Sequence, residues 1–343
     1  MDIIRNSAFT LAIIACNLLC NNEAIAQVDS SRVVNEAMQL INFPEPSFSG
    51  PFNFIPTPKS IADMGLEQPN MNLSAQYKME DGVIIKSKKY PFDGKRTAIL
   101  VHGVLSNNYT FNKMAGLVRD ALNAEVIAID LRGHGESGGK PGDIAESNQY
   151  ASDLNTIIRT IKEAKPSESI VLVGHSMGGG IILRHAETFN TTEVDGYLLF
   201  APNLGPNSPT TSSKIDLKNN FIQTHLSRGL GLKMLNEMGI HDYDSMKVVF
   251  YNPPNGSPIK SYTYRSSISS YPEDLKGTLK NLKAPIITVV GAKDEAFIAD
   301  EYPTVFNAYS SGECHLFDGE THNGIRHNEK AFKVIKKWAD KKL

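Results

Sequence analysis

Short apolar runs recur along the chain from about residue 77, and stretches with helical spacing separate several of them. The runs are brief, unbroken and rich in β-branched residues, which is typical of strands buried on both faces of a sheet. Six such strands are predicted, at 97–101, 125–130, 170–173, 196–201, 285–290 and 314–317. Helical spacing predicts helices at 150–163 and 328–341, and an Asp-Gly turn predicts a β-hairpin at 77–90. This alternation predicts an α/β fold with a mostly parallel sheet covered by helices on both faces.

Two segments depart from this alternation. Residues 27–76 are rich in proline, serine and asparagine, so we predict an irregular N-terminal segment with one short helix near 33–40. Residues 202–282 are too many for a single crossover connection. We therefore predict that they form a cap or lid inserted between two parts of the core, 77–201 and 283–343.

The glycine-rich turn after the strand at 170–173 carries the strongest candidate chemistry. Residues 174–178 read G-H-S-M-G, and an apolar helix follows them. A serine on a sharp strand-to-helix turn adopts strained backbone geometry, and its neighbours must be small to avoid collisions. Ser176 is therefore expected to project its hydroxyl above the edge of the sheet. The N–H groups of the helix that begins there would face an oxyanion formed over that hydroxyl.

Two further loops follow predicted strands. The strand at 97–101 ends in His102-Gly103-Val104, and residues 130–137 have the order D-x-R-G-H-G-x-S. With the G-x-S-x-G turn, these ordered motifs make the chain resemble the serine α/β-hydrolases of the monoacylglycerol lipase, lysophospholipase and serine aminopeptidase type. The resemblance extends from about residue 77 to the C-terminus.

The resemblance implies a catalytic triad of Ser176, Asp294 and His322, in the chain order expected of this fold. Each of the three directly follows a predicted strand, where loops at one edge of the sheet converge. Ser176 would be the nucleophile, His322 the general base and acid, and Asp294 the group that orients the imidazole. The backbone N–H groups of Val104 and Met177 would form the oxyanion hole.

Other residues near the predicted triad compete for the same roles. Glu295 and Asp318 are the rival acids, and His315 and His327 are the rival bases. The side chains of two histidines in the glycine loops, His102 and His134, are expected to be structural. Within the loop at 130–137, Arg132 and Ser137 are expected to tie down the backbone.

Charge and metal-ligand spacing narrow the range of partners. The 35 basic and 37 acidic residues nearly cancel, which gives no electrostatic case for binding nucleic acid. His315, His322 and His327 match no zinc signature, so no metal is assigned. No dinucleotide fingerprint or phosphate-binding loop is present, and no cofactor is expected. The expected partner is a small-molecule or lipid-like ester, and contact with a membrane surface is left open.

The first 26 residues resemble a secretory signal peptide. Arg5 precedes an apolar stretch at 8–19, and small residues at 24–26 offer a cleavage position. The apolar stretch is shorter than the roughly 20 residues that a spanning helix needs. We therefore expect an exported protein, periplasmic or secreted, that begins near Gln27; lipid attachment at Cys16 is the less favoured route. Cleavage would leave Cys314 as the only cysteine and exclude an intramolecular disulfide.

The sequence leaves three functions open. The first is hydrolysis of a carboxylic ester, such as a monoacylglycerol or lysophospholipid, through an acyl-enzyme. The second is an aminopeptidase of the same fold, with an acid in the insertion to hold a free amine; Glu237, Asp242 and Asp244 are candidates. The third is a non-catalytic binding protein on a hydrolase scaffold. Apolar residues of the insertion suit an acyl chain, but packing of the insertion on itself explains them equally well.

Overall fold

The computed structural model describes residues 30–52, 55–189, 193–212, 220–253 and 257–343. The predicted export signal, 1–26, lies outside the described residues. The chain divides into two compact units, Met1–Glu45 with Leu226–Tyr243, and Pro46–His225 with Asp244–Leu343.

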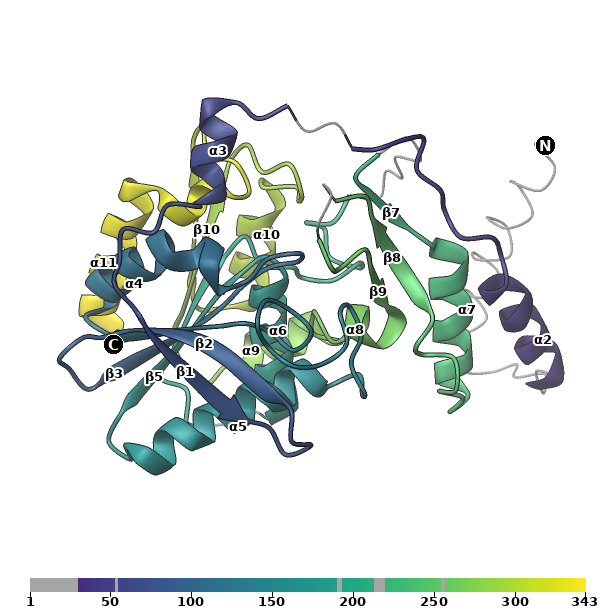
Figure 1. Cartoon of the computed structure of the whole chain (residues 1–343), viewed down its shortest axis with the longest axis horizontal. Coiled ribbons are helices and arrows are strands. Elements are labelled where there is room, and N and C mark those ends of the chain that lie inside the picture. Colours follow the sequence, from purple (N-terminus) through teal and green to yellow (C-terminus); the bar gives the residue numbers. More distant parts are fainter. Residues whose placement is uncertain (1–29, 53–54, 190–192, 213–219, 254–256) are drawn as a thin grey trace. The chain divides into compact units, whose positions relative to one another are not determined.

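The larger unit is built on a sheet of eight strands in its described part, in the order β1-β2-β4-β3-β5-β6-β10-β11 (Figure 1). Their bounds are β1 Leu73–Lys78, β2 Ile84–Tyr90, β3 Arg96–Val101, β4 Glu125–Ile129, β5 Ser169–His175, β6 Gly196–Phe200, β10 Ile286–Gly291 and β11 Glu313–Phe317. Strands β1 and β2 form the predicted hairpin, and β2 pairs antiparallel with β4. All remaining pairs are parallel, which confirms the predicted α/β fold and brings the carboxyl ends of these strands to one edge.

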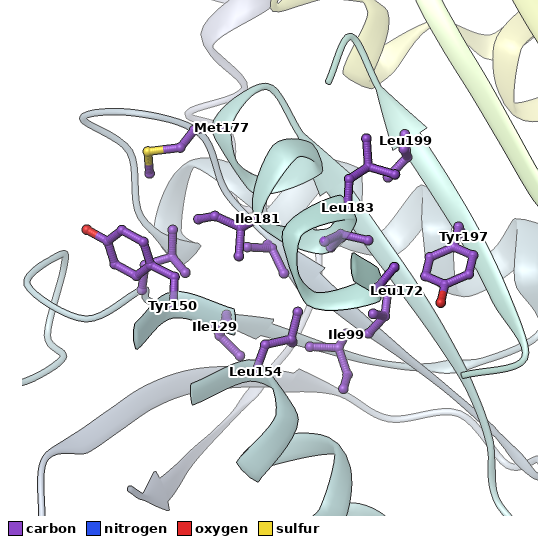
Figure 2. Close-up of a cluster of buried hydrophobic side chains, with 14 of the residues drawn as sticks. Ile99, Ile129, Tyr150, Leu154, Leu172, Met177, Ile181, Leu183, Tyr197 and Leu199 are labelled. Carbon is purple, nitrogen blue, oxygen red and sulfur yellow. The ribbon is translucent and has the colours of Figure 1, made fainter. Parts of the chain in front are cut away.

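Helices cover both faces of this sheet because successive residues of its strands point to opposite sides. In β3, Ile99 and Val101 join one buried cluster, and Ala98 and Leu100 join the other. Helices contributing to the first cluster are α5 Gln149–Ala164, α6 Met177–Phe189, α9 Leu275–Asn281 and α10 Glu301–Tyr309. Helices contributing to the second are α4 Asn112–Leu122 and α11 Glu329–Lys342. Figure 2 shows the first cluster, where Leu154 of α5 and Ile181 of α6 meet side chains of the central strands.

The interval predicted as an insertion, 202–282, contains a second sheet that the sequence pattern did not predict. Strands β7 Ile222–Thr224, β8 Lys247–Tyr251 and β9 Ser261–Thr263 are antiparallel, and helix α8 Tyr264–Ile268 follows directly. Thr263 N–H donates to the carbonyl of Gly142, 3.0 Å away. Arg265 forms two hydrogen bonds with the carboxylate of Asp143, at 2.9 and 3.0 Å. These bonds join β9 and α8 to the core loop that precedes α5.

The N-terminal part of the larger unit packs beside the loop that carries His322. Helix α3 Pro58–Met64 begins with a capping box formed by Thr57 and Ser60, which satisfies two N–H groups that a helix start leaves free. The Asp63 carboxylate accepts from Thr321 Oγ1 at 2.8 Å. The short 3₁₀ helices η1 Asn108–Phe111 and η2 Gly324–His327 also lie in this unit. The core begins at β1, four residues before the predicted start at residue 77.

In its described part, the smaller unit contains α2 Ser30–Ile41 and α7 Leu226–Glu237, which pack closely (Figure 1). A Cβ on Gly231 would lie 2.7 Å from the carbonyl oxygen of Ala37, so only glycine permits this approach. Arg228 donates to the carbonyl of Ile41 at 3.0 Å. The helix predicted near 33–40 is therefore α2, and the predicted insertion 202–282 is divided between two units. In the described part of the chain, no helix has both the length and the apolar character needed to span a bilayer.

Candidate active site

The turn between β5 and α6 consists of a single residue, Ser176, in left-handed backbone geometry. Its φ is 55°, which is uncommon for a residue with a side chain. Ser176 N–H donates to the carbonyl of Phe200 at 3.0 Å, which ties the turn to β6. A Cβ on Gly178 would lie 2.2 Å from the carbonyl oxygen of Val101, so this position admits only glycine. The G-x-S-x-G pattern thus has the mechanical cause expected from the sequence.

His322 and Asp294 lie together in the loops that follow β11 and β10. His322 Nδ1 is 2.8 Å from Asp294 Oδ2, and the Asp294 side chain has 0% of its surface exposed. The other carboxylate oxygen, Oδ1, accepts the N–H groups of Ala296 and Phe297, both at 2.8 Å. Because an ionised carboxylate only accepts, Nδ1 of His322 is the protonated nitrogen and Nε2 is left free to take a proton.

Neither rival acid, Glu295 or Asp318, contacts the imidazole of His322. Glu295 Oε2 accepts the backbone N–H of His322 at 2.9 Å, so this carboxylate holds the main chain rather than the ring. Asp318 is exposed in the turn after β11. Of the three acids considered, only Asp294 contacts the imidazole of His322.

A second side chain binds the backbone of His322, and it comes from the strand-to-helix turn at residues 174–178, here called the elbow. His175 Nε2 donates to the carbonyl of His322 at 2.9 Å, and the two rings are 4.6 Å apart between centroids. Burial lowers the pKa of His175 well below its usual value, so this imidazole stays neutral. His175, which precedes Ser176, therefore binds the backbone carbonyl of His322, and Glu295, which follows Asp294, binds its backbone N–H. The sequence reasoning missed both contacts, and adjacency to the predicted triad was the only signal for them.

The loop after β3 passes directly beside the elbow. A Cβ on Gly103 would come within 3.1 Å of Ser176 Cβ. Among the described residues, the backbone N–H groups of Val104 and Met177 have no hydrogen-bond acceptor. Two predicted donors are thus unpaired near the hydroxyl that they are expected to serve.

His102 at the end of β3 supports this loop through its ring. Nδ1 donates to the carbonyl of Gly103 at 2.8 Å, and Nε2 accepts the N–H of Leu131 at 3.0 Å. Burial lowers the pKa of His102 to about 4. Both ring nitrogens are occupied, which is the structural role expected for this side chain.

The loop at 130–137 is held by the two side chains that the sequence singled out. Arg132 makes two hydrogen bonds to the buried carboxylate of Asp153, at 2.8 and 2.7 Å, and also pairs with Asp81. Ser137 Oγ donates to the carbonyl of Asp130 at 2.7 Å and accepts the N–H of Lys86 at 2.8 Å. Arg132 and Ser137 therefore anchor the loop to the β1–β2 hairpin and to α5.

The three histidines near the C-terminus have separate environments. His322 pairs with Asp294, while His315 Nε2 lies 3.0 Å from Glu313 Oε2. His327 packs under Gly65, where an added Cβ would lie 2.4 Å from the imidazole. Within the described ranges, no group of three histidine, cysteine or carboxylate side chains is arranged to hold a metal ion.

Residues 93–330 match the model of the serine aminopeptidase family S33, a span of more than half of the chain. The chain belongs to this family. It is therefore an α/β hydrolase of the monoglyceride lipase and serine aminopeptidase type.

Similar proteins include several lipases. The chain is 29% identical to a monoacylglycerol lipase of Mycolicibacterium smegmatis over 28% of its own length and 34% of that protein. It is 30% identical to the monoglyceride lipase of Rattus norvegicus over 39% of this chain and 45% of the relative. These alignments thus cover less than half of either relative.

Solved structures share the fold at lower identity. Est1E from Butyrivibrio proteoclasticus, solved with ferulic acid, matches with a TM-score of 0.57 and 16% identity, covering 78% of this chain and 99% of that one. A monoacylglycerol lipase of Paleococcus ferrophilus matches with a TM-score of 0.52 and 20% identity, covering 78% and 98%. At these identities the likeness bears on the fold alone.

Proposed function

We propose that the protein is a serine hydrolase that cleaves a carboxylic ester of a lipid-like or small acyl substrate through an acyl-enzyme intermediate. The observation that carries this proposal is the bond between His322 Nδ1 and the buried carboxylate of Asp294, with Ser176 on the neighbouring turn. A histidine oriented by a carboxylate beside a strained serine is the arrangement that activates a hydroxyl for acyl transfer.

The proposed reaction has two halves, formation and hydrolysis of the acyl-enzyme, and each catalytic group acts once in each. Ser176 Oγ attacks the ester carbonyl while His322 Nε2 takes the hydroxyl proton, and the carbonyl oxygen becomes an oxyanion. The unpaired N–H groups of Val104 and Met177 stabilise that charge. His322 then gives its proton to the leaving alcohol. A water molecule repeats the sequence on the acyl-enzyme, which releases the acid and restores Ser176.

The names of the similar lipases support an ester as the substrate class. The candidate acids for binding a free amine give the peptidase alternative no such support. Glu237 is a surface residue that pairs with Lys233 at 3.3 Å on the same helix. Asp242 is exposed, and Asp244 is buried in the turn before β8.

Substrate profiling tests the proposed reaction. We expect the purified protein to hydrolyse p-nitrophenyl esters, with higher kcat/KM for medium or long acyl chains than for acetate, because each buried methylene contributes up to about 0.8 kcal/mol of binding. The Ser176→Ala variant supplies the background rate. Faster cleavage of aminoacyl anilides than of every ester would contradict the proposal and favour the aminopeptidase.

A further inference from the structure

The residue after the proposed oxyanion donor Val104 has an unfavourable backbone conformation. Leu105 has a φ of 55°, in the left-handed region that side chains with a Cβ rarely occupy. Such a conformation costs on the order of 1–3 kcal/mol and persists only where surrounding contacts hold it. The direction of Val104 N–H depends on this stretch of backbone, so whatever holds Leu105 also aims the donor.

The contact that holds Leu105 comes from the second sheet. Leu105 N–H donates to the hydroxyl oxygen of Tyr262, on β9, at 3.1 Å. The same hydroxyl lies 2.8 Å from His134 Nε2, and His134 Nδ1 lies 2.9 Å from the carbonyl oxygen of Arg132. The hydroxyl of Tyr262 thus joins the loop after β3 to the loop after β4.

Chemistry allows only one direction for this chain of hydrogen bonds. The Arg132 carbonyl can only accept, so His134 carries its proton on Nδ1 and accepts on Nε2. Tyr262 therefore donates its proton to His134, and its oxygen remains to accept from Leu105. Burial raises the pKa of Tyr262 well above its usual value and lowers that of His134 to about 3. Neither group changes its protonation near neutral pH.

Tyr262 is itself firmly placed. The residue is 3% exposed, and its ring stacks on the His134 ring with centroids 5.8 Å apart. The next residue, Thr263, donates its N–H to Gly142 at 3.0 Å and its hydroxyl to Asp143 at 2.9 Å. A hydroxyl on a buried ring, on a strand bonded to the core, is a rigid support for the loop.

We propose that Tyr262 is a positioning residue for the oxyanion hole: its hydroxyl holds Leu105 in the left-handed conformation and thereby aims Val104 N–H at the developing oxyanion. This inference rests on the proposed ester hydrolysis. The segment after β6, which contains Tyr262, then supports the chemical step as well as any selection of the substrate.

The test compares two tyrosine-to-phenylalanine variants in the full-length protein. Removing an oxyanion donor lowers kcat by about 10²–10³, so misdirecting one in Tyr262→Phe should lower kcat about ten- to a hundredfold with KM changed less than about twofold. Tyr251→Phe is the matched control. Tyr251 is buried on β8 with its ring 5.8 Å from that of Tyr262, and no hydrogen bond joins its hydroxyl to Leu105 or His134. Its kcat should stay within about twofold of the parent value.

A second variant separates positioning from general support of the fold. Glycine adopts a positive φ at little cost, so Leu105→Gly in the Tyr262→Phe background should recover part of the lost kcat. A trifluoromethyl ketone, which forms an oxyanion on Ser176, should lose affinity in Tyr262→Phe in parallel with kcat and regain it in the double variant.

Three results would overturn the positioning role. They are equal kcat values for Tyr262→Phe and Tyr251→Phe, a loss of kcat that Leu105→Gly does not reduce, and loss of the folded state in both Tyr262 variants while Tyr251→Phe melts normally. The proposed function fails separately, because it predicts ester hydrolysis by the unaltered protein. An inactive parent protein would therefore refute both, and an active parent with one of these results would refute the positioning role alone.

Discussion

The Asp294→Asn variant should lose about 10⁴-fold in kcat, because the new amide would impose the wrong tautomer on His322. The surrounding donors determine how that amide lies. Oδ1 of Asp294 accepts two backbone N–H groups at 2.8 Å, from Ala296 and Phe297, so the amide oxygen will remain there. The amide NH₂ must then face His322 Nδ1, which becomes the acceptor. The proton moves to Nε2, and the imidazole can no longer take a proton from Ser176.

Glu295→Gln is the matched control for this prediction. A glutamine oxygen can still accept the backbone N–H of His322, as the Glu295 carboxylate does at 2.9 Å. We therefore expect kcat to change less than about tenfold, in line with the net value of one hydrogen bond. Steady-state kinetics on one p-nitrophenyl ester, with thermal melts of both variants, make the comparison. A larger loss in Glu295→Gln than in Asp294→Asn would mean that the acid is misassigned.

Acidification below about pH 6.5 should destabilise the fold steeply, because burial keeps five histidines neutral in the folded chain. Burial lowers the pKa of His102 and His185 to about 4, that of His134 and His327 to about 3, and that of His175 well below 6.5. Above pH 6.5 these imidazoles are neutral in both the folded and the unfolded chain, and they add no pH dependence. Between pH 6.5 and about 4 the unfolded chain binds protons that the folded chain excludes. The free energy of unfolding therefore falls as the pH falls, by up to about 1.4 kcal/mol per pH unit for each histidine.

Urea denaturation at pH 7.5, 6.0 and 5.0 measures the slope of the free energy of unfolding against pH, and two variants identify the source of that slope. His185 is fully buried, with Nε2 3.2 Å from Asn155 Oδ1, and a glutamine amide can replace that donor. His185→Gln should reduce the slope by about one proton. Phe189→Leu is the control, because the Phe189 ring packs against that of His185 with centroids 5.2 Å apart and does not titrate, so this change should leave the slope unchanged. Equal slopes for the parent protein and His185→Gln would show that burial of this imidazole does not set the acid sensitivity.

The sequence predicted the parts of the fold that depend on local pattern. All six predicted core strands are present, and α5 and α11 lie within a residue or two of their predicted ranges. Buried strands of a parallel sheet are continuous apolar runs, and the glycines of the elbow mark positions with no room for a side chain. These signals are contained in a few neighbouring residues, so they can be read without knowledge of the fold.

The remaining structure depends on partners far apart in the chain. Strands β7 and β9 have three residues each, too few for an alternating pattern to be recognised. Helix α2 packs on α7, almost 200 positions away, and this partner divides the predicted insertion between two units. Tyr262 meets Leu105 from 157 positions away through a single hydroxyl, and no motif marks it. The sequence suggested Glu295 as a rival acid, but its bond to the backbone N–H of His322, 27 positions away, has no signal in the sequence beyond its place next to Asp294.

Covalent labelling tests the central claim, that Ser176 is an activated nucleophile. A fluorophosphonate probe reacts with serines whose hydroxyl has an adjacent general base: the base takes the hydroxyl proton, the serine oxygen bonds to phosphorus, and fluoride leaves. The phosphonylated serine is stable, so the label is irreversible. We expect the purified protein to bind one probe per chain, to lose ester hydrolysis in proportion to labelling, and to yield a modified peptide with the mass shift on Ser176. The Ser176→Ala variant should remain unlabelled while retaining its thermal melt. Equal labelling of Ser176→Ala, or a label on another serine of the parent protein, would contradict the account.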